Sequence, residues 1–333
     1  MPPIPPSATP LPRLILYYQT LHDSQDKPIS ILPLLTQPGI SVTHVILAAI
    51  HINDDPAALT LNDHVPAHPR YQTLWAELRV LQASGIKVMG MLGGAAKGSY
   101  ERLDGDEARF ERYYLPLRDM IRARGLDGLD LDVEEDMSLA GAVRLIDRLR
   151  ADFGPTFTIT FAPVAMALLD YTKNLSGFDY EALEVMRGRD IAWYNAQFYC
   201  GWGVFSNTLM YDMMLQKGWP AEKLVVGLVT NPANGGGFVD WRALEEVLRI
   251  LKQRPHSFGG VMGWEYFNSL PGDRDRPWEW ARALTGMLRA HCLKGPEGED
   301  TGKADAVVDP DEPGAQAVQL PKPFEYYSDG TEE

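Results

Sequence analysis

The sequence predicts an α/β fold, and within that class a single-domain (β/α)8 TIM barrel. Runs typical of buried β-strands alternate along the chain with longer stretches of helical spacing, and this alternation implies a parallel sheet. Eight such units occupy about 280 of the 333 residues, which is the size of a closed eight-stranded barrel. The rival is a doubly wound open sheet, but no G-x-G-x-x-G motif follows the first strand.

Strands are expected where apolar residues form short continuous or alternating runs. The eight runs are 14–19, 43–52, 87–92, 128–134, 156–162, 191–199, 224–229 and 259–264. Several intervening segments carry apolar residues three and four apart, as one face of a helix requires. These stripes are Leu74, Leu78 and Leu81; Tyr114, Leu117, Met120 and Ile121; Leu145, Ile146 and Leu149; and Leu244, Val247, Leu248 and Leu251. Gly85, Gly125 and Gly154 are expected to end three of the helices.

Composition and charge are those of a soluble globular protein. Hydrophobic residues make up 45% of the chain and charged residues 23%. No apolar run reaches the roughly 18 residues that a membrane-spanning helix needs. The net charge of −14 argues against nucleic acids and anionic membranes as partners. We therefore expect no nucleic-acid and no membrane partner. A monomer is expected as well.

The two ends of the chain differ in composition from its centre. Residues 1–12 form a Pro-rich lead without the basic start and hydrophobic core of a signal peptide, so we expect a cytoplasmic protein, or a secreted one if a leader has been removed. Residues 294–333 carry 11 acidic and three basic residues, which predicts a disordered acidic tail. A docking motif at 321–327 is the functional alternative. The barrel itself is assigned to residues 13–293.

The cysteines and histidines predict no metal site, and we expect no cofactor. Cys200 and Cys292 lie far apart without C-x-x-C spacing, which argues against a disulfide framework or a cysteine-ligated metal. Because no His stands near Cys200 in the sequence, we expect this residue to be a small buried group and not a nucleophile.

The most informative segment is 127–134, which reads Asp-Gly-Leu-Asp-Leu-Asp-Val-Glu. Side chains two apart on a strand point to the same face, so Asp130, Asp132 and Glu134 share one side and the apolar residues share the other. This alternation is too regular for a solvated loop. Enclosed carboxylates do not all ionise cheaply, so at least one pKa should be raised, which suits a general acid near neutral pH.

Other predicted strands also end in residues that bind ligands. Active sites of such barrels lie at the carboxyl ends of the strands, where Glu134 ends the fourth strand. Gln197 and Tyr199 share a face at the end of the sixth, where polar groups are costly unless they bond to a ligand or to each other. Trp264, on the eighth, offers a flat apolar face on which a sugar ring can rest.

The first and third strand ends complete this set. Tyr17 ends the first strand, and Gly93 and Gly94 at the third let the backbone turn sharply or approach a ligand. Singly, each has a plain structural explanation, because Tyr17 and Trp264 could be core residues and a turn alone accounts for the glycines. Together, carboxylates, an amide, a phenol and an indole describe a carbohydrate cleft.

The segment 127–134 resembles the D-G-x-D-x-D-x-E signature of glycoside hydrolase family 18, the retaining chitinases and endo-β-N-acetylglucosaminidases. Residues 92–94, 197–199 and 260–265 resemble the family's motifs on strands three, six and eight. The resemblance covers about residues 13–293. Within the family, segments such as 148–155 are most similar to the fungal endo-β-N-acetylglucosaminidase branch.

This resemblance implies a substrate-assisted retaining mechanism, in which the substrate's own 2-acetamido oxygen is the nucleophile and an oxazolinium ion forms. Glu134 would protonate the glycosidic oxygen and later act as base toward water. Asp132 would bond the acetamido N–H, and Asp130 would share a proton with Asp132. Tyr199 would bond the acetamido oxygen. The remaining substrate-binding residues would be Gln197, Trp264, Tyr17, Gly93 and Gly94.

The predicted substrate is an N-glycan, cleaved in its N,N'-diacetylchitobiose core, or another N-acetylglucosamine-containing oligosaccharide. One alternative is an endochitinase acting on β-1,4-N-acetylglucosamine polymers with the same catalytic residues. Another is a catalytically inactive, lectin-like glycan-binding protein, which usually lacks one of the motif's acids. A third is a cytosolic scaffold recruited through the acidic tail.

Overall fold

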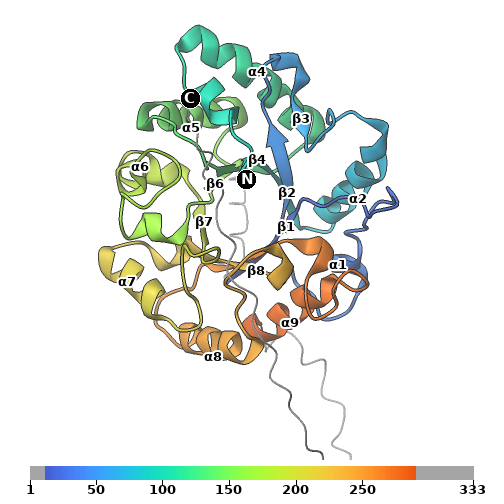
Figure 1. Ribbon diagram of the computed structural model, residues 1–333, viewed down its shortest axis with the longest axis vertical. Helices are drawn as coiled ribbons and strands as arrows, with labels where there is room; N and C mark the ends of the chain where they lie inside the picture. The colour runs from blue at the N-terminus through green and yellow to red at the C-terminus, as the bar shows by residue number, and fades with distance from the viewer. Residues whose placement is uncertain (1–11, 290–333) are drawn as a thin grey trace, which may run out of the picture. The chain divides into compact units, whose positions relative to one another are not determined.

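The computed structural model describes residues 12–289, which form a closed barrel of parallel strands surrounded by helices (Figure 1). The predicted acidic tail at 294–333 and all but Pro12 of the predicted Pro-rich lead lie outside these residues, so both stay predictions. The described elements run from Arg13, at the start of the first strand, to Leu288, at the end of the last helix.

Eight parallel strands close the barrel, and one short strand is added to it. The strands are β1 (Arg13–Tyr18), β2 (His44–His51), β3 (Thr60–Leu61), β4 (Lys87–Gly93), β5 (Gly128–Asp132), β6 (Thr158–Phe161), β7 (Trp193–Gln197), β8 (Leu224–Val229) and β9 (Gly260–Trp264). Around the barrel the order is β1-β9-β8-β7-β6-β5-β4-β2, and β2 pairs with β1 to close it. β3 pairs antiparallel with the end of β2. The predicted (β/α)8 fold is confirmed.

Helices follow the strands and form the outer layer (Figure 1). They are α1 (Pro33–Thr36), α2 (Gln72–Ala83), α3 (Ser99–Leu103), α4 (Glu107–Arg124), α5 (Leu139–Phe153), α6 (Tyr180–Arg187), α7 (Leu209–Lys217), α8 (Trp241–Lys252) and α9 (Trp278–Leu288). The four predicted apolar stripes lie on α2, α4, α5 and α8, and all their residues except the half-buried Met120 are buried. Gly85, Gly125 and Gly154 follow the ends of α2, α4 and α5, as expected.

The alternation along the strands divides the interior into two cores. Outward-facing strand residues such as Leu129 and Leu131 pack with the helices. Inward-facing residues such as Ile46, Met89 and Met262 fill the lumen of the barrel. Because β5 places Leu129 and Leu131 outward, it must place Asp130 and Asp132 inward, so carboxylates enter an otherwise apolar lumen.

The predicted fourth strand is shorter than expected at its carboxyl end. β5 ends at Asp132 instead of Glu134 because its neighbour β4 ends at Gly93, the partner of Asp132 in the ladder. The Gly94 N–H then donates to the Asp132 carbonyl at 2.9 Å, and no strand continues beside the next residues. Glu134 therefore leaves the sheet at the mouth of the barrel. Between residues 12 and 289, no helix is both long and apolar enough to span a bilayer.

Candidate active site

Three carboxyl groups rise through the lumen toward the mouth of the barrel. Asp130 is completely buried and Asp132 is 6% exposed, whereas Glu134 is half-buried. This order follows from the strand, because each step of two residues moves the side chain about 6.6–6.8 Å along the barrel. Only Glu134 reaches a position where a large substrate can approach it.

Asp130 is held by donors from three other strands. Its Oδ2 accepts from the Tyr17 hydroxyl at 2.5 Å, and its Oδ1 accepts from the Thr160 hydroxyl at 2.5 Å and from Asn195 Nδ2 at 3.0 Å. Trp193 Nε1 donates to Asn195 Oδ1 at 2.9 Å and so orients that amide. Burial raises the pKa of Asp130, while the three hydrogen bonds act in the opposite direction.

The expected contact between Asp130 and Asp132 takes a different form. Both Asp130 oxygens bond to Tyr17, Thr160 and Asn195, and no hydrogen bond joins the two carboxyl groups within residues 12–289. The physical reason is that donors from three other strands already occupy both oxygens of Asp130, while Oδ1 of Asp132 accepts from Gln197 Nε2 at 3.1 Å. Asp130 instead acts on Asp132 through its charge, which raises the pKa of Asp132.

Gln197 joins the two upper carboxyl groups. Its Nε2 lies 3.1 Å from Asp132 Oδ1 and 3.4 Å from Glu134 Oε1, and it donates to the Ala162 carbonyl at 2.9 Å. Burial, reinforced by the charges of Glu134 and Asp130, raises the pKa of Asp132 well above its ordinary value. Burial also raises the pKa of Glu134, against the hydrogen bond from Gln197. The pair is therefore suited to hold a proton near neutral pH.

Two aromatic side chains flank these acids. Tyr199 is 8% exposed, and its hydroxyl makes no hydrogen bond to any residue of the described chain. Burial raises the pKa of Tyr199 well above its ordinary value, so the phenol stays protonated and available as a donor. Trp264 is half-buried, and its ring centroid lies 5.5 Å from that of Tyr17 at an interplanar angle of 59°. Tyr17 thus contacts both Asp130, through its hydroxyl, and Trp264, the residue on which a sugar ring is expected to rest.

Gly93 and Gly94 have different surroundings. At Gly93 the backbone φ is +91°, and a Cβ would lie 2.4 Å from the Tyr100 ring and 2.5 Å from the Asp132 carbonyl oxygen. The turn therefore explains Gly93. A Cβ on Gly94 would lie 3.6 Å from Asp132 Oδ2, so this residue borders the catalytic carboxyl group.

Sequence reasoning missed several residues that build the site. Asn195 stands two residues before Gln197, so the same alternation identifies it as lumen-facing. Thr160 carries no such signal, because threonine is an ordinary strand residue. Glu265 is buried beside Trp264 and accepts hydrogen bonds from the segment after β1. Only the closed barrel brings these strands together.

Two expectations about sulfur and metal ligands can be compared with the structure. Cys200 is exposed, not buried as expected, because it lies in a turn just after β7 with φ +53°. His64 and His68 stand four residues apart, with ring centroids 4.5 Å from each other. Between residues 12 and 289, no group of three or more His, Cys, Asp or Glu side chains is arranged to hold a metal ion.

A parallel eight-stranded barrel with clustered acids, an amide, a phenol and an indole at its mouth defines a glycoside hydrolase. The chain belongs to family 18 of the glycosyl hydrolases, whose profile matches residues 13–235. That match extends from β1 past β8 and includes the whole acidic strand β5.

Two solved structures are similar to this chain over most of its length. A fungal endo-β-N-acetylglucosaminidase of glycosyl hydrolase family 18 is 50% identical, with 85% of this chain and 100% of that chain covered and a TM-score of 0.82. The chitinase ChiC from Aspergillus fumigatus is 56% identical, with 81% and 96% covered and a TM-score of 0.75. Chitinase 2 from Rhizopus oligosporus is 26% identical over an alignment of 211 residues that covers 57% of this chain. The match spans only 36% of that relative's length.

Proposed function

We propose that this protein is an endo-β-N-acetylglucosaminidase that cleaves the β-1,4 bond in the N,N'-diacetylchitobiose core of N-glycans. The likeness to the fungal endo-β-N-acetylglucosaminidase, which covers the whole of that chain with the higher of the two TM-scores, supports this substrate. A cytoplasmic location is part of the proposal.

The closeness of Asp132 and Glu134 is the observation that carries the mechanism. One nitrogen, Gln197 Nε2, contacts an oxygen of each carboxyl group. The two contacted oxygens therefore lie at most about 6.5 Å apart, the lower limit of the separation that an inverting enzyme needs for its water molecule, and this closeness favours retention. Retention then needs a nucleophile, and the acetamido oxygen of the substrate can supply it.

The residues divide the reaction between them. Glu134, the most accessible of the three acids, gives its proton to the glycosidic oxygen as the bond to C1 breaks and the acetamido oxygen bonds C1. Asp132 accepts from the acetamido N–H and stabilises the positive charge that develops there. The Tyr199 hydroxyl donates to the acetamido oxygen. Water then bonds C1 and gives a proton to Glu134, and the acetamido oxygen leaves.

The decisive experiment is mass spectrometry of the products released from a high-mannose glycopeptide. The proposed function predicts a free glycan with one reducing-end N-acetylglucosamine and a peptide that keeps the other on Asn. Glu134→Gln should lower turnover at least about 1,000-fold while glycan binding persists, because only the acid is lost. Near-normal hydrolysis by this variant would contradict the assignment of Glu134.

Endochitinase activity is the second candidate, and the 56% identity to the Aspergillus fumigatus chitinase favours it. The catalytic residues would be the same, so they do not discriminate. Chitin oligomers and the high-mannose glycopeptide should be assayed side by side with one enzyme preparation. Efficient cleavage of the oligomers with none of the glycopeptide would replace the first proposal by the second.

A further inference from the structure

A chain of hydrogen bonds runs from Asp130 down into the barrel lumen. Asn195 Nδ2 donates to Asp130 Oδ1 at 3.0 Å and to the Tyr17 hydroxyl oxygen at 3.2 Å. The Oδ1 of Asn195 accepts from Trp193 Nε1 at 2.9 Å. Trp193 and Asn195 stand two residues apart on β7, so both side chains point into the lumen. The Asn195 amide thereby joins Trp193 to Asp130.

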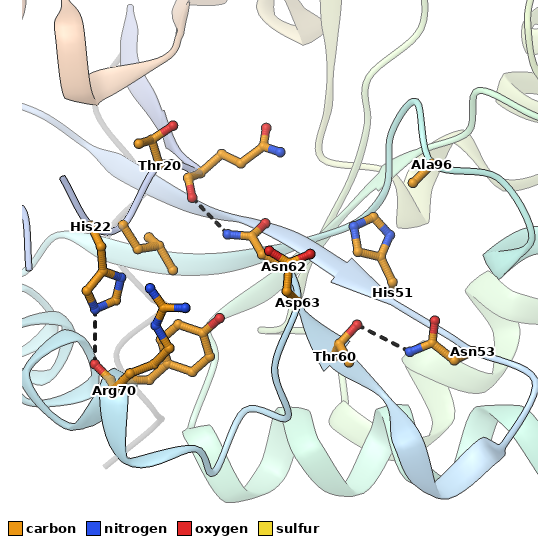
Figure 2. A pocket seen from close by; sticks show the side chains of 12 residues that line it. Thr20, His22, His51, Asn53, Thr60, Asn62, Asp63, Arg70 and Ala96 are labelled. Atoms are coloured by element: carbon orange, nitrogen blue, oxygen red, sulfur yellow. Dashed lines mark hydrogen bonds between the residues drawn. The ribbon is translucent and has the colours of Figure 1, made fainter. Parts of the chain in front are cut away.

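These residues are closed to bulk water. Asp130 and Asn195 are completely buried, and Trp193 is 2% exposed. Figure 2 shows a polar hollow of about 490 Å³ at the carboxyl end of the barrel, lined by residues such as Thr20 and His51. Its lining includes no member of the chain from Asp130 to Trp193. Each polar group in this chain must therefore find its partner in the protein.

The indole of Trp193 is held in place by two neighbours. The central carbon of the Arg13 guanidinium lies 4.4 Å from the indole centroid, and the His44 ring centroid lies 4.7 Å from it at an interplanar angle of 62°. Arg13 is itself anchored, because its Nη1 donates to the Glu222 carbonyl at 2.7 Å. These contacts keep the indole N–H directed at Asn195.

The indole fixes the direction of the hydrogen bonds along the chain. An indole N–H only donates, so the atom that faces it must be the amide oxygen of Asn195, and the amide NH2 then faces Asp130. The hydroxyls of Tyr17 and Thr160 can turn either to donate or to accept. Trp193, in contrast, has no acceptor atom and cannot reverse its role.

The three partners of Asp130 then all serve as donors. Tyr17, Thr160 and Asn195 offer it hydrogens and no acceptor, an arrangement that suits a carboxylate and not a carboxylic acid. These hydrogen bonds oppose the effect of burial, which raises the pKa of Asp130. The charge of Asp130 in turn raises the pKa of Asp132. An anion at Asp130 thus favours a proton on the acids above it.

We propose that Trp193 is a positioning residue whose N–H, acting through the Asn195 amide, keeps Asp130 ionised, so that the proton needed for catalysis stays on Asp132 and Glu134. This inference rests on the glycosidase chemistry of the proposed function. It does not depend on the substrate, because the same residues would cleave an N-glycan or chitin. Trp193 lies at the start of β7, below Asn195 and Asp130, so it acts without touching the sugar.

The other titratable groups near Asp130 and Trp193 keep one charge state near neutral pH. Burial lowers the pKa of His44 to about 3, so its ring is neutral. Burial also lowers the pKa of Arg13 to about 10, so it remains a cation. Burial raises the pKa of the neighbouring phenols, which stay protonated: Tyr17, Tyr100, Tyr180 and Tyr199. A change of activity near neutral pH therefore reports the three acids.

Trp193→Phe keeps an aromatic ring and removes the N–H. The Asn195 amide is then free to flip, so Asp130 loses a fixed donor and is protonated more often. A neutral Asp130 no longer raises the pKa of the acids above it, so the alkaline limb of kcat/KM should move to lower pH by about half a unit. Near neutral pH, kcat should fall about fivefold with KM nearly unchanged. The assay uses chitin oligomers or the high-mannose glycopeptide, whichever the wild type cleaves.

A double-variant cycle with Asn195→Leu tests whether Trp193 acts through the amide. In the Asn195→Leu background, Trp193→Phe should change neither the alkaline limb nor kcat any further. Trp219→Phe is the matched control, because Trp219 is also buried and its Nε1 donates to the Leu168 carbonyl at 2.8 Å. The Trp219 ring packs against Tyr194 in the outer core, so its loss should leave the pH profile in place.

Additive effects of Trp193→Phe and Asn195→Leu, or an unchanged alkaline limb in Trp193→Phe, would overturn the proposal. NMR titration of the Asp130 carboxyl carbon, assigned by comparison with Asp130→Asn, needs no turnover. In the wild type this group should be ionised at neutral pH, and its pKa should be higher in Trp193→Phe. A protonated Asp130 in the wild type, or equal pKa values, would also overturn the proposal. If the wild type cleaves neither substrate, the proposed function fails, and this titration still decides the role of Trp193.

Discussion

At the scale of one residue, Asp132 lowers the stability of the folded protein but supplies a charge that the proposed reaction uses. It is buried beside two other acids, and Gln197 is its one side-chain hydrogen-bond donor within the described chain. Burial and the neighbouring charges raise its pKa well above the ordinary value, so ionisation at neutral pH is costly in the folded state. The same environment makes its charge effective toward a cation that forms in the cleft.

Asp132→Asn should therefore raise stability while it lowers hydrolysis. The pKa of such a carboxyl group is higher in the folded protein than in the unfolded one, where it lies near 4. The group therefore stabilises the folded state fully below pH 4, and this contribution is lost as pH rises through the folded pKa. At pH 7 the variant should melt about 2–4 °C higher than the wild type, and the gain should vanish near pH 3. Thermal melts at both pH values measure this. Equal melting temperatures at pH 7 would contradict the assigned cost of the buried acid.

The activity of the same variant tests the role of Asp132 in the reaction. Formation of the oxazolinium ion should be impaired, so hydrolysis of the glycopeptide should fall about 100-fold or more. Transfer of a sugar supplied as a ready-made oxazoline to an acceptor should persist, because that step starts after Asp132 has acted. Hydrolysis of the normal substrate at full rate would exclude the assisted mechanism.

At the scale of elements, the turn after β4 determines how β5 presents its acids. Gly93 ends β4 opposite Asp132, and its backbone lies against the Tyr100 ring and the Asp132 carbonyl. Glu135 holds the following loop, because its carboxylate accepts from the Gly98 N–H at 2.6 Å and the Tyr100 N–H at 2.9 Å. The residues on either side of Glu134 are thus fixed by the neighbouring loop.

Gly93→Ala should unfold more easily than the wild type by about 3 kcal/mol, because a Cβ meets two groups and the left-handed backbone disfavours alanine. Gly85→Ala is a matched control, since its φ is +89° but a Cβ there has nothing within 4 Å. Its expected cost is only about 1 kcal/mol. Urea denaturation of both variants measures the difference. Similar free energies of unfolding for the two variants would show that Tyr100 and the Asp132 carbonyl can move aside for the added Cβ at little cost.

At the scale of the whole molecule, the two ends of the lumen titrate in opposite senses. The carboxyl end holds acids with raised pKa values. Near the amino end, His44 is buried with its ring centroid 4.7 Å from that of Trp193. Burial, together with the charges of Arg13 and Lys87 and against that of Asp127, lowers the pKa of His44 to about 3.

His44 should make the barrel sensitive to acid. Because its folded pKa of about 3 lies below the unfolded value near 6.5, the unfolded state binds more protons between these values, and stability falls as pH falls through that window. From pH 7 to pH 5 the wild type should lose about 2 kcal/mol more than His44→Gln. Urea denaturation at both pH values tests this. Parallel losses in the two proteins would exclude His44 as the cause.

The fold could be predicted closely from the sequence, because the apolar runs of the strands and the apolar stripes of the helices are strong and recur along the chain. Each barrel strand lies within or one residue beyond a predicted run, and the four stripes are on helices whose buried faces they form. The two-residue β3 was too short to leave a pattern. The predicted burial of Cys200 was wrong, because the chain turns three residues after β7 ends at Gln197 and leaves this side chain exposed.

The sequence by itself determined the barrel, the inward direction of Asp130, Asp132 and Glu134, and the strand ends that carry Gln197, Tyr199 and Trp264. These follow from period-two alternation and the order of elements, which are local properties of the chain. Only the tertiary structure decided that Tyr17, Thr160 and Asn195 hold Asp130 and that Gln197 contacts both Asp132 and Glu134. Such contacts depend on register and closure between strands far apart in sequence, which no local pattern encodes.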